Sequence, residues 1–413
     1  MKRYVYILCL CSLFLVLGST LKAQDVQRFS ERPIIGTARY VGMGGAMTAI
    51  GADPSAVQDN PAGLGLYRRA EIMLTLDGMI DRTCQKESNE VYKQARFALP
   101  QVSAVWAWGN PNKQRGMIYN NFMFSIQRLA NYNRDVVVAG SGMGMAQTIG
   151  EKTNGLAEEF LIDTPWDDEE IGWLSILGYE GFLIDPIENN RWIPAVDFNA
   201  GTLSVSETGS VDQYTLSWAS NISNQWYVGL SLNIPTITYT KHISLLETNR
   251  FNSAELKSMY YASGLGVNGT IGLIYRPIQA LRIGASFQTP SVMHLSVQTE
   301  GDMYSTINGQ NYEILTPSSG SINTTLASPL RTSMSVAGQI GNAALIAVQY
   351  DYTHAPKDKE LGFSPMEDVH TLRVGAEAQA TRGLYINAGY VYESSFLKED
   401  PIWMLSYNEI RTD

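Results

Sequence analysis

Apolar and polar residues alternate with a period of two over most of the chain from residue 70 onward. In Leu281–Gln288, for example, Leu, Ile, Ala and Phe occupy one face and Arg, Gly, Ser and Gln the other. This period is typical of β-strands with one apolar face. It predicts strands near residues 70–81, 100–109, 116–128, 212–221, 225–245, 258–276, 280–300, 320–340, 342–353, 369–379 and 383–393. A soluble sandwich alternates in the same way, so alternation alone does not choose between a sandwich and a barrel.

The segments between the predicted strands alternate strictly in length. The long ones are residues 82–99, 129–211, 246–257, 301–319 and 354–368. After each long segment come two strands that are joined by a tight turn, such as Asn221–Gln225 or Arg276–Ala280. Long loops at one end and short turns at the other are the layout of an outer-membrane barrel. The prediction is therefore an all-β, antiparallel transmembrane β-barrel, with aromatic residues near the strand ends as an interfacial girdle.

The amino terminus has the pattern of a secretory signal. Lys2 and Arg3 precede an apolar run from Tyr4 to Leu17, and small residues lead to Ala23, where we expect cleavage. The run is shorter than the roughly 20 residues of a membrane-spanning helix. Residues 1–23 are thus expected to be a signal peptide of a protein exported to the cell outer membrane. Removing them takes away three basic residues and no acidic ones from a chain that already has a formal net charge of −10, which argues against nucleic acid as a partner.

Catalytic and metal-binding patterns are not found in the sequence. His242, His294, His354 and His370 are scattered, without the spacing of a Ser-His-Asp triad or a zinc site. After signal cleavage Cys84 would be the one cysteine left. We expect no enzyme activity, no metal and no cofactor. The four dispersed histidines also give little support for a haem-binding function.

Residues 24–69 are Gly-rich and not strand-like. Asp53 can cap a helical turn with Pro54 at its first position, and Pro61 disfavours helix at Asn60 and so ends that turn. No strand precedes the glycines, which argues against a dinucleotide-binding loop.

These features together resemble a known family. The Gly-rich stretch 36–46, the motif Asn60-Pro61-Ala62 and the strand pattern of residues 264–290 resemble the FadL/TodX family of outer-membrane transporters for long-chain fatty acids and aromatic hydrocarbons. Residues 128–133 are similar to the variety found in Bacteroidetes-type bacteria. The resemblance implies that residues 24–69 form a hatch in the lumen and that residues 70–413 form the barrel. It also implies passive uptake of a hydrophobic small molecule by a monomer that is surrounded by outer-membrane lipid.

The resemblance also implies fourteen strands, whereas eleven are predicted here. Single-chain bacterial barrels close with even numbers of strands. We therefore expect the last strands to be missing, with a gap beside residues 70–81.

In the family, ligand leaves sideways through an inward kink of the third strand, next to the hatch. On the predicted third strand Asn120 and Asn121 mark this lateral opening, and Asn120 interrupts an otherwise apolar face. One interpretation is that Asn120 bonds the hatch near Asn60, beside a gap in strand pairing. The other is that it lies at the headgroup level or meets a neighbouring strand.

Two further groups of residues have alternative interpretations. A short helix is predicted from the acids 167–170 to Gly178, and with it Trp166, Trp173, Tyr179 and Phe182 form either a capture surface for ligand or a lid packed on the barrel mouth. Arg282, Arg373 and Glu377 fall on the lumen face, where they either pair with the hatch or hold a ligand carboxylate.

A rival function from another class is a FadL-like barrel that serves protein partners, as accessory barrels of type IX secretion do. Such a barrel needs no intact apolar route, so an apolar lumen with bound lipid or detergent would distinguish the two.

Overall fold

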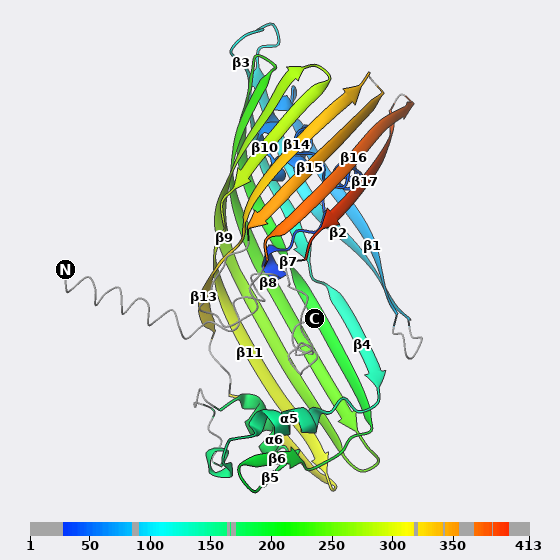
Figure 1. The fold of residues 1–413 in the computed structure, drawn as a ribbon, viewed down its shortest axis with the longest axis vertical. Coiled ribbons are helices and arrows are strands. Elements are labelled where there is room, and N and C mark those ends of the chain that lie inside the picture. The colour runs from blue at the N-terminus through cyan, green and yellow to red at the C-terminus, as the bar shows by residue number, and fades with distance from the viewer. Residues whose placement is uncertain are drawn as a thin grey trace, which may run out of the picture.

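The computed structural model describes residues 28–84, 91–162, 166, 171–317, 321–341, 343–354, 367–381 and 383–395. Within these residues fifteen strands form one large antiparallel sheet, whose path runs β1-β2-β3-β7-β8-β9-β10-β14-β15-β16-β17, and β5 and β6 form a separate hairpin. The sheet curves around the N-terminal residues, and the segment with α5 and α6 lies at one end of it (Figure 1). The eleven strands of this path agree with the eleven predicted from the alternation.

The wall strands differ greatly in length. The first ones are β1 (Glu71–Cys84), β2 (Val91–Gly109), β3 (Met117–Asn131), β4 (Arg134–Gly140), β7 (Ala200–Ile222), β8 (Trp226–Thr248) and β9 (Ser253–Ile278). The others are β10 (Leu281–Gln288), β11 (Val292–Ile307), β12 (Gln310–Ile314), β13 (Ile322–Ala327), β14 (Leu330–Ile340), β15 (Ala344–His354), β16 (Val369–Thr381) and β17 (Leu384–Glu393). The wall is therefore tall at β7–β9 and β11 and short at β14–β17 (Figure 1).

Three runs of the wall are each interrupted and so divided into two strands. β10 and β11 both pair with β9 and are separated at Thr289-Pro290; β13 and β14 are separated at Ser328-Pro329; and β3 and β4 both pair with β7. Proline lacks the N–H that a ladder needs, so it favours such interruptions. These interruptions divide the tall wall into a turn-side half and a loop-side half.

In the turn-side half the outward face is apolar and the inward face is polar. The exposed outward side chains include Leu216, Leu230, Leu232, Ile234, Leu265, Val267, Ile271, Leu273, Ile283 and Phe287. The buried inward ones include Gln213, Thr215, Ser217, Ser231, Asn233, Asn268, Thr270, Ser286 and Gln288. At the turn end Trp226 stacks on Tyr275, with ring centroids 4.1 Å apart. This is the pattern of a wall with lipid outside and polar groups inside.

In the loop-side half the two faces exchange their polarity. On β8 the outward residues become Thr238, Thr240 and His242, whereas most buried inward side chains of the loop-side wall become apolar, with Glu207, Lys241 and Glu247 as charged exceptions. The buried apolar residues are Val205, Val211, Ile237, Tyr239, Leu245, Ala254, Leu256, Ala262, Met293, Leu295, Val297 and Met303. The loop-side half of the wall thus presents a polar surface outside and an apolar surface to the lumen.

Residues 28–69, here called the hatch, lie on the inward face of the turn-side half. They contain α3 (Ala38–Gly42), α4 (Pro54–Asp59) and the 3-10 helix η1 (Pro61–Leu66). Asp53 caps α4 by accepting a 2.8 Å bond from Ser55 N, and Pro54 is its first residue, as predicted. These short helices have little stability alone, so packing against the wall must hold them.

Glycines on the wall allow the hatch backbone to come very close. A Cβ added to Gly284 of β10 would lie 2.5 Å from Thr48 O, one on Gly375 of β16 would lie 2.6 Å from Met43 O, and one on Gly229 of β8 would lie 2.5 Å from Ala62 N. Gly272 of β9 and Gly389 of β17 have similar contacts with Asn60-Pro61 and Met43-Gly44. We call these five residues the glycine track; it fits the wall to the hatch main chain.

Some expectations lie outside what the structure describes, and several of the expected long loops were wrong. Residues 91–99 belong to β2, and residues 301–307 and 310–314 belong to β11 and β12. Residues 129–211 were expected to be a long loop, but β4 and residues 200–211 of β7 are wall strands. The signal segment 1–23 lies outside the described residues. Among the described residues β1 and β17 are the two ends of the sheet path, and the expectation that strands are missing stays a prediction. Within the same residues no helix is long and apolar enough to cross a membrane.

Candidate functional site

The loop end of the tall wall is covered by a lid, which consists of the described residues 141–162, 166 and 171–199. It contains α5 (Met145–Thr153), η2 (Glu158–Phe160), α6 (Trp173–Glu180) and the hairpin of β5 (Ile184–Ile187) and β6 (Arg191–Pro194). The lid and the wall share one apolar core, which includes Ile149, Ile176, Leu183, Leu256 and Met303.

Two polar contacts fix the lid to the wall. The buried carboxylate of Glu247 on β8 accepts from the main-chain N–H groups of Met143 and Met145, the latter at 2.8 Å. Ser305 of β11 donates to Gly181 O at 2.7 Å. A carboxylate at the N-terminus of α5 is favoured by the helix dipole as well. The lid is therefore bound to the wall at its N-terminal end and at the end of α6.

A cavity of about 700 Å³ lies between the lid and the wall. We call it the chamber. The lid contributes Leu156, Trp173, Leu174 and Leu177, and the wall contributes Ile243, Leu245 and Leu256, while Lys152 and Glu300 add charged groups. The volume and the mainly apolar lining with a few polar groups are those of small-molecule sites.

The four predicted capture residues are not gathered in one surface. Trp173 lines the chamber, and Trp166 packs edge-on against it with centroids 6.3 Å apart. Tyr179 instead packs on Trp192, and Phe182 on Tyr312 at 4.4 Å. The latter two contacts favour the alternative of a packed lid. The acids 167–170, predicted to start the helix, lie outside the described residues, and α6 ends at Glu180 rather than Gly178.

On the hatch side of the chamber, aromatic rings pack together across the lumen. Phe29 of the hatch packs edge-on against Tyr132 and Tyr239, with centroids 6.2 Å and 5.9 Å away. Tyr132 donates to Arg28 O at 2.7 Å, and Tyr239 donates to Glu207 at 2.6 Å. The first residues of the described hatch therefore form the floor of the apolar lumen.

Asn60 of the predicted motif binds both the hatch and the wall. Its Nδ2 donates to Thr48 O at 2.7 Å and to Leu273 O of β9 at 3.2 Å, and its Oδ1 accepts from Ala62 N at 3.0 Å. Pro61 and Ala62 follow as the first buried residues of η1. The motif thus forms a turn that fits against β9.

On β3 the interpretation that Asn120 bonds the hatch beside a gap in pairing was wrong, and its place opposite neighbouring strands agrees with the alternative. Asn121, and not Asn120, faces the lumen, where its Nδ2 donates to Leu64 O at 2.7 Å and to Tyr67 O at 2.9 Å. Asn120 is on the outward face near the start of the strand, opposite Trp108 and Ser220. Residues 119–127 pair without a break with both β2 and β7, so β3 has no lateral gap there. The reason is parity: Asn120 shares the face of Phe122 and Phe124, and that face is the exposed, outward one.

The predicted charges of the lumen contact the hatch or its surroundings. Arg282 donates to Ile50 O at 2.8 Å. Glu377 accepts two hydrogen bonds from Arg39, at 2.6 and 3.0 Å. Arg373 lies 2.9 Å from Asp351, at an angle outside hydrogen-bond geometry. The first two contacts are those of the pairing alternative.

Asp59 of α4 is the hatch carboxylate next to Arg373. It accepts a 2.6 Å bond from the Tyr40 hydroxyl. Burial raises the pKa of both groups above their ordinary values, and the positive charge of Arg373 opposes this effect. Among the described residues no group of three or more His, Cys, Asp or Glu could hold a metal ion.

The wall side of the chamber was not predicted. Ile243, Leu245 and Leu256 lie on strands that were predicted, but their inward direction was not recognised. The available signal was a change of phase: on β8 the apolar residues fall on even numbers up to Ile234 and on odd numbers from Ile237.

No family model and no curated protein matches the chain. The fold is similar to the solved toluene transporters TbuX of Ralstonia pickettii (15% identity, 87% of each chain covered, TM-score 0.45) and TodX of Pseudomonas putida (12% identity, 89% of this chain and 86% of that one, TM-score 0.42). It is also similar to a Pseudomonas aeruginosa FadL homologue (11% identity, 89% and 82% covered, TM-score 0.48). These belong to the group that the sequence resembles. At such identities the likeness carries no information on a substrate.

Proposed function

We propose that the chain is a FadL/TodX-type channel of the cell outer membrane, for passive uptake of hydrophobic small molecules such as long-chain fatty acids or aromatic hydrocarbons. The observation that carries the proposal is the exchange of polarity along the tall wall. The turn-side half has the apolar exterior of a lipid-embedded barrel. The loop-side half has a polar exterior and an apolar interior, so it is suited to stand in water and hold an apolar ligand.

The chamber supplies the driving force for capture. An apolar molecule gains about 25 cal/mol for each Å² of surface removed from water. A chamber lined by Leu174, Leu177, Leu245 and Leu256 offers such a surface on the outer side of the membrane. Lys152 and Glu300 at its edge can bind a polar end of the ligand.

The hatch excludes an aqueous pore as the route. It lies across the turn-side lumen, in main-chain contact with the glycine track. A ligand in the chamber therefore has no straight route through the lumen, and because β3 pairs continuously at residues 119–127 its exit does not lie at the expected kink. An apolar chamber of this kind favours transport over a barrel that serves only protein partners.

Adjacent leucines of β8 give the test. Leu245 is buried and lines the chamber, whereas Leu246 is 38% exposed on the outward face. We expect Leu245→Asn to weaken binding of a fluorescent long-chain fatty acid about tenfold or more, because burying a leucine contributes about 1.5–3 kcal/mol. Leu246→Asn should bind like the parent protein.

Binding is measured on purified protein in detergent, and uptake in cells that lack their own fatty-acid channel. Native mass spectrometry of the parent protein should show a co-purified apolar molecule. Equal binding by the two variants, together with no retained ligand, would overturn the proposal.

A further inference from the structure

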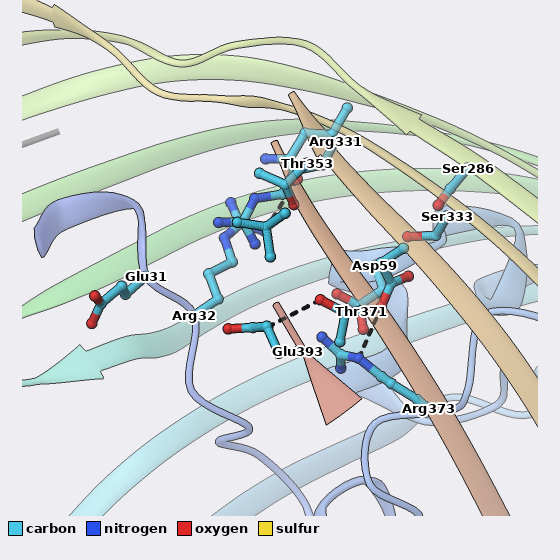
Figure 2. Close-up of a pocket in the computed structure, with 13 residues that line it drawn as sticks. Glu31, Arg32, Asp59, Ser286, Arg331, Ser333, Thr353, Thr371, Arg373 and Glu393 are labelled. Atoms are coloured by element: carbon cyan, nitrogen blue, oxygen red, sulfur yellow. Dashed lines mark hydrogen bonds and ion pairs between the residues drawn. The ribbon is translucent and has the colours of Figure 1, made fainter. Parts of the chain in front are cut away.

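A second, much smaller cavity lies at the junction between the hatch and the short wall. Its volume is about 50 Å³, and it is lined by Ser286, Gln288, Ser333 and Thr353 as well as by charged groups. Two arginines reach it from opposite partners, Arg32 from the hatch and Arg331 from β14 (Figure 2). It is separate from the chamber, and its ligand does not depend on the proposed transport.

Both guanidinium groups have neutral partners. Arg32 Nη1 donates to Gln288 Oε1 at 3.1 Å, and Arg331 Nη2 donates to the main-chain oxygen of Ser30. Neither arginine forms an ion pair within 4.0 Å among the described residues. Each guanidinium has five N–H donors, so most of their donor capacity is left for the cavity.

The carboxylates that line the cavity have partners of their own. Asp59 accepts from Tyr40, Asp351 accepts from Gln349 at 2.8 Å and contacts Arg373, and Glu393 accepts from Thr371 at 3.0 Å. Figure 2 shows Arg32 and Arg331 together, with Asp59, Thr371 and Arg373 in a separate group. The fourth carboxylate, Glu31, is exposed and points away from the two arginines (Figure 2).

Two neighbouring cations whose hydrogen-bond partners are neutral are unfavourable at this half-buried junction, because partial removal from water penalises each charge and the two repel. The charge of Asp59 opposes this penalty for both arginines. Burial lowers the pKa of Arg32, which is the direction that this penalty requires. A single anion that accepts bonds from both guanidiniums would remove the repulsion and use the free donors.

We propose that this cavity binds one small anion, a halide or a carboxylate group, between Arg32 and Arg331. A water molecule needs only about 10–15 Å³ of such volume, so the cavity has room for a halide ion or a carboxylate group. Because one arginine belongs to the hatch and the other to the wall, the anion joins the two and stabilises the docked hatch.

Bromide is the first probe, because its anomalous X-ray scattering locates it directly. Crystals of the full chain soaked in sodium bromide should show an anomalous peak between Arg32 and Arg331. In solution, sodium chloride and sodium acetate should each slow hydrogen exchange of hatch amides 28–40, compared with gluconate at equal ionic strength. Decanoate as a third anion distinguishes a free ion from the head group of a fatty acid: a fatty acid that reaches the site displaces bromide.

Arg331→Gln is expected to weaken the anion effect about tenfold or more, since hydrogen bonds to charged groups contribute about 1.5–3 kcal/mol. Arg282→Gln is the matched control, because Arg282 also joins wall and hatch but does not line the cavity; it should keep the anion effect. No bromide peak in the parent protein, or water alone at that place, would overturn the proposal even if Arg331→Gln does not fold. An equal anion effect in both variants would do the same.

Discussion

Asn121 shows how one buried amide can hold a segment with little regular structure. Its side chain is fully buried and donates to two main-chain oxygens of η1 and its C-cap, those of Leu64 and Tyr67. Asn60 does the same between the hatch and β9. Main-chain oxygens of an irregular segment need donors when they are buried, and side-chain amides of the wall supply them.

Asn121→Ala should loosen the end of the hatch. Loss of two buried hydrogen bonds costs roughly 1–3 kcal/mol, so hydrogen exchange of the amides of residues 61–67 should become at least several-fold faster. Asn120→Ala is the neighbouring control, since Asn120 faces outward and has no bond to the hatch among the described residues. The same exchange rates in both variants would contradict the role given to Asn121.

These two asparagines also show a limit of the sequence. Alternation correctly places Asn120 on the apolar face and Asn121 on the opposite one. The expected bond from Asn120 to the hatch came from the family's inward kink, which the continuous pairing of β3 lacks. By contrast, the cap at Asp53 and Pro54 depends only on neighbouring residues, and it was predicted correctly.

At the scale of elements, the glycine track determines where the hatch can dock. The track crosses β8, β9, β10, β16 and β17, and each of its glycines meets hatch main chain. Hatch and wall are thus matched by the absence of side chains, whereas most docked segments are matched by interlocking side chains.

Gly272→Ala tests this match. The added methyl would overlap Asn60 Oδ1 and lie 2.8 Å from Pro61 Cδ. Such overpacking typically costs 1–3 kcal/mol, and moving the hatch relieves it. We expect increased ion conductance in planar bilayers and a greater sensitivity of cells to large hydrophilic antibiotics.

Gly269→Ala on the same strand is the control, because the nearest atom to its added Cβ is Ser231 O at 3.8 Å. Conductance that rises equally in both variants would show that the strand, and not the docking of the hatch, is affected.

The strands themselves were largely predictable, and the exceptions have one cause. Residues 200–211 were taken as part of a loop because their outward residues, such as Ser206 and Thr208, are polar. An apolar outward face is required only where the wall meets lipid. The aromatic residues of the lid left a capture surface and a packed lid open as alternatives, because packing on β8 and β11 depends on contacts between residues far apart in the sequence.

For the whole molecule, the apolar exterior defines the part that the proposed function places in the membrane. On β8 it extends from Trp226 to Ile234. At about 3.3 Å per residue and a tilt near 40°, this segment rises about 20 Å, close to the apolar band of roughly 25 Å found in outer-membrane barrels.

Arginine at two outward positions of β8 tests this placement. Leu230 is near the middle of the apolar band and 49% exposed, whereas Leu246 is on the polar half of the wall. Leu230→Arg should lower the free energy of unfolding from lipid vesicles by about 2–4 kcal/mol, and Leu246→Arg by about 0–1 kcal/mol. Guanidinium titration followed by Trp fluorescence measures both. A larger loss at Leu246 would move the membrane to the other half of the wall.

The abrupt change of outward polarity also has a consequence for immersion depth. A displacement outward by one residue pair, about 5 Å, would lift one apolar side chain of each tall strand into water, at about 1.5–3 kcal/mol for each. A displacement inward would carry Thr236 and Asp212 toward hydrocarbon, where hydroxyl and carboxylate groups are costly. The protein is therefore held at one depth, and the mouth of the chamber stays at a constant height above the membrane surface.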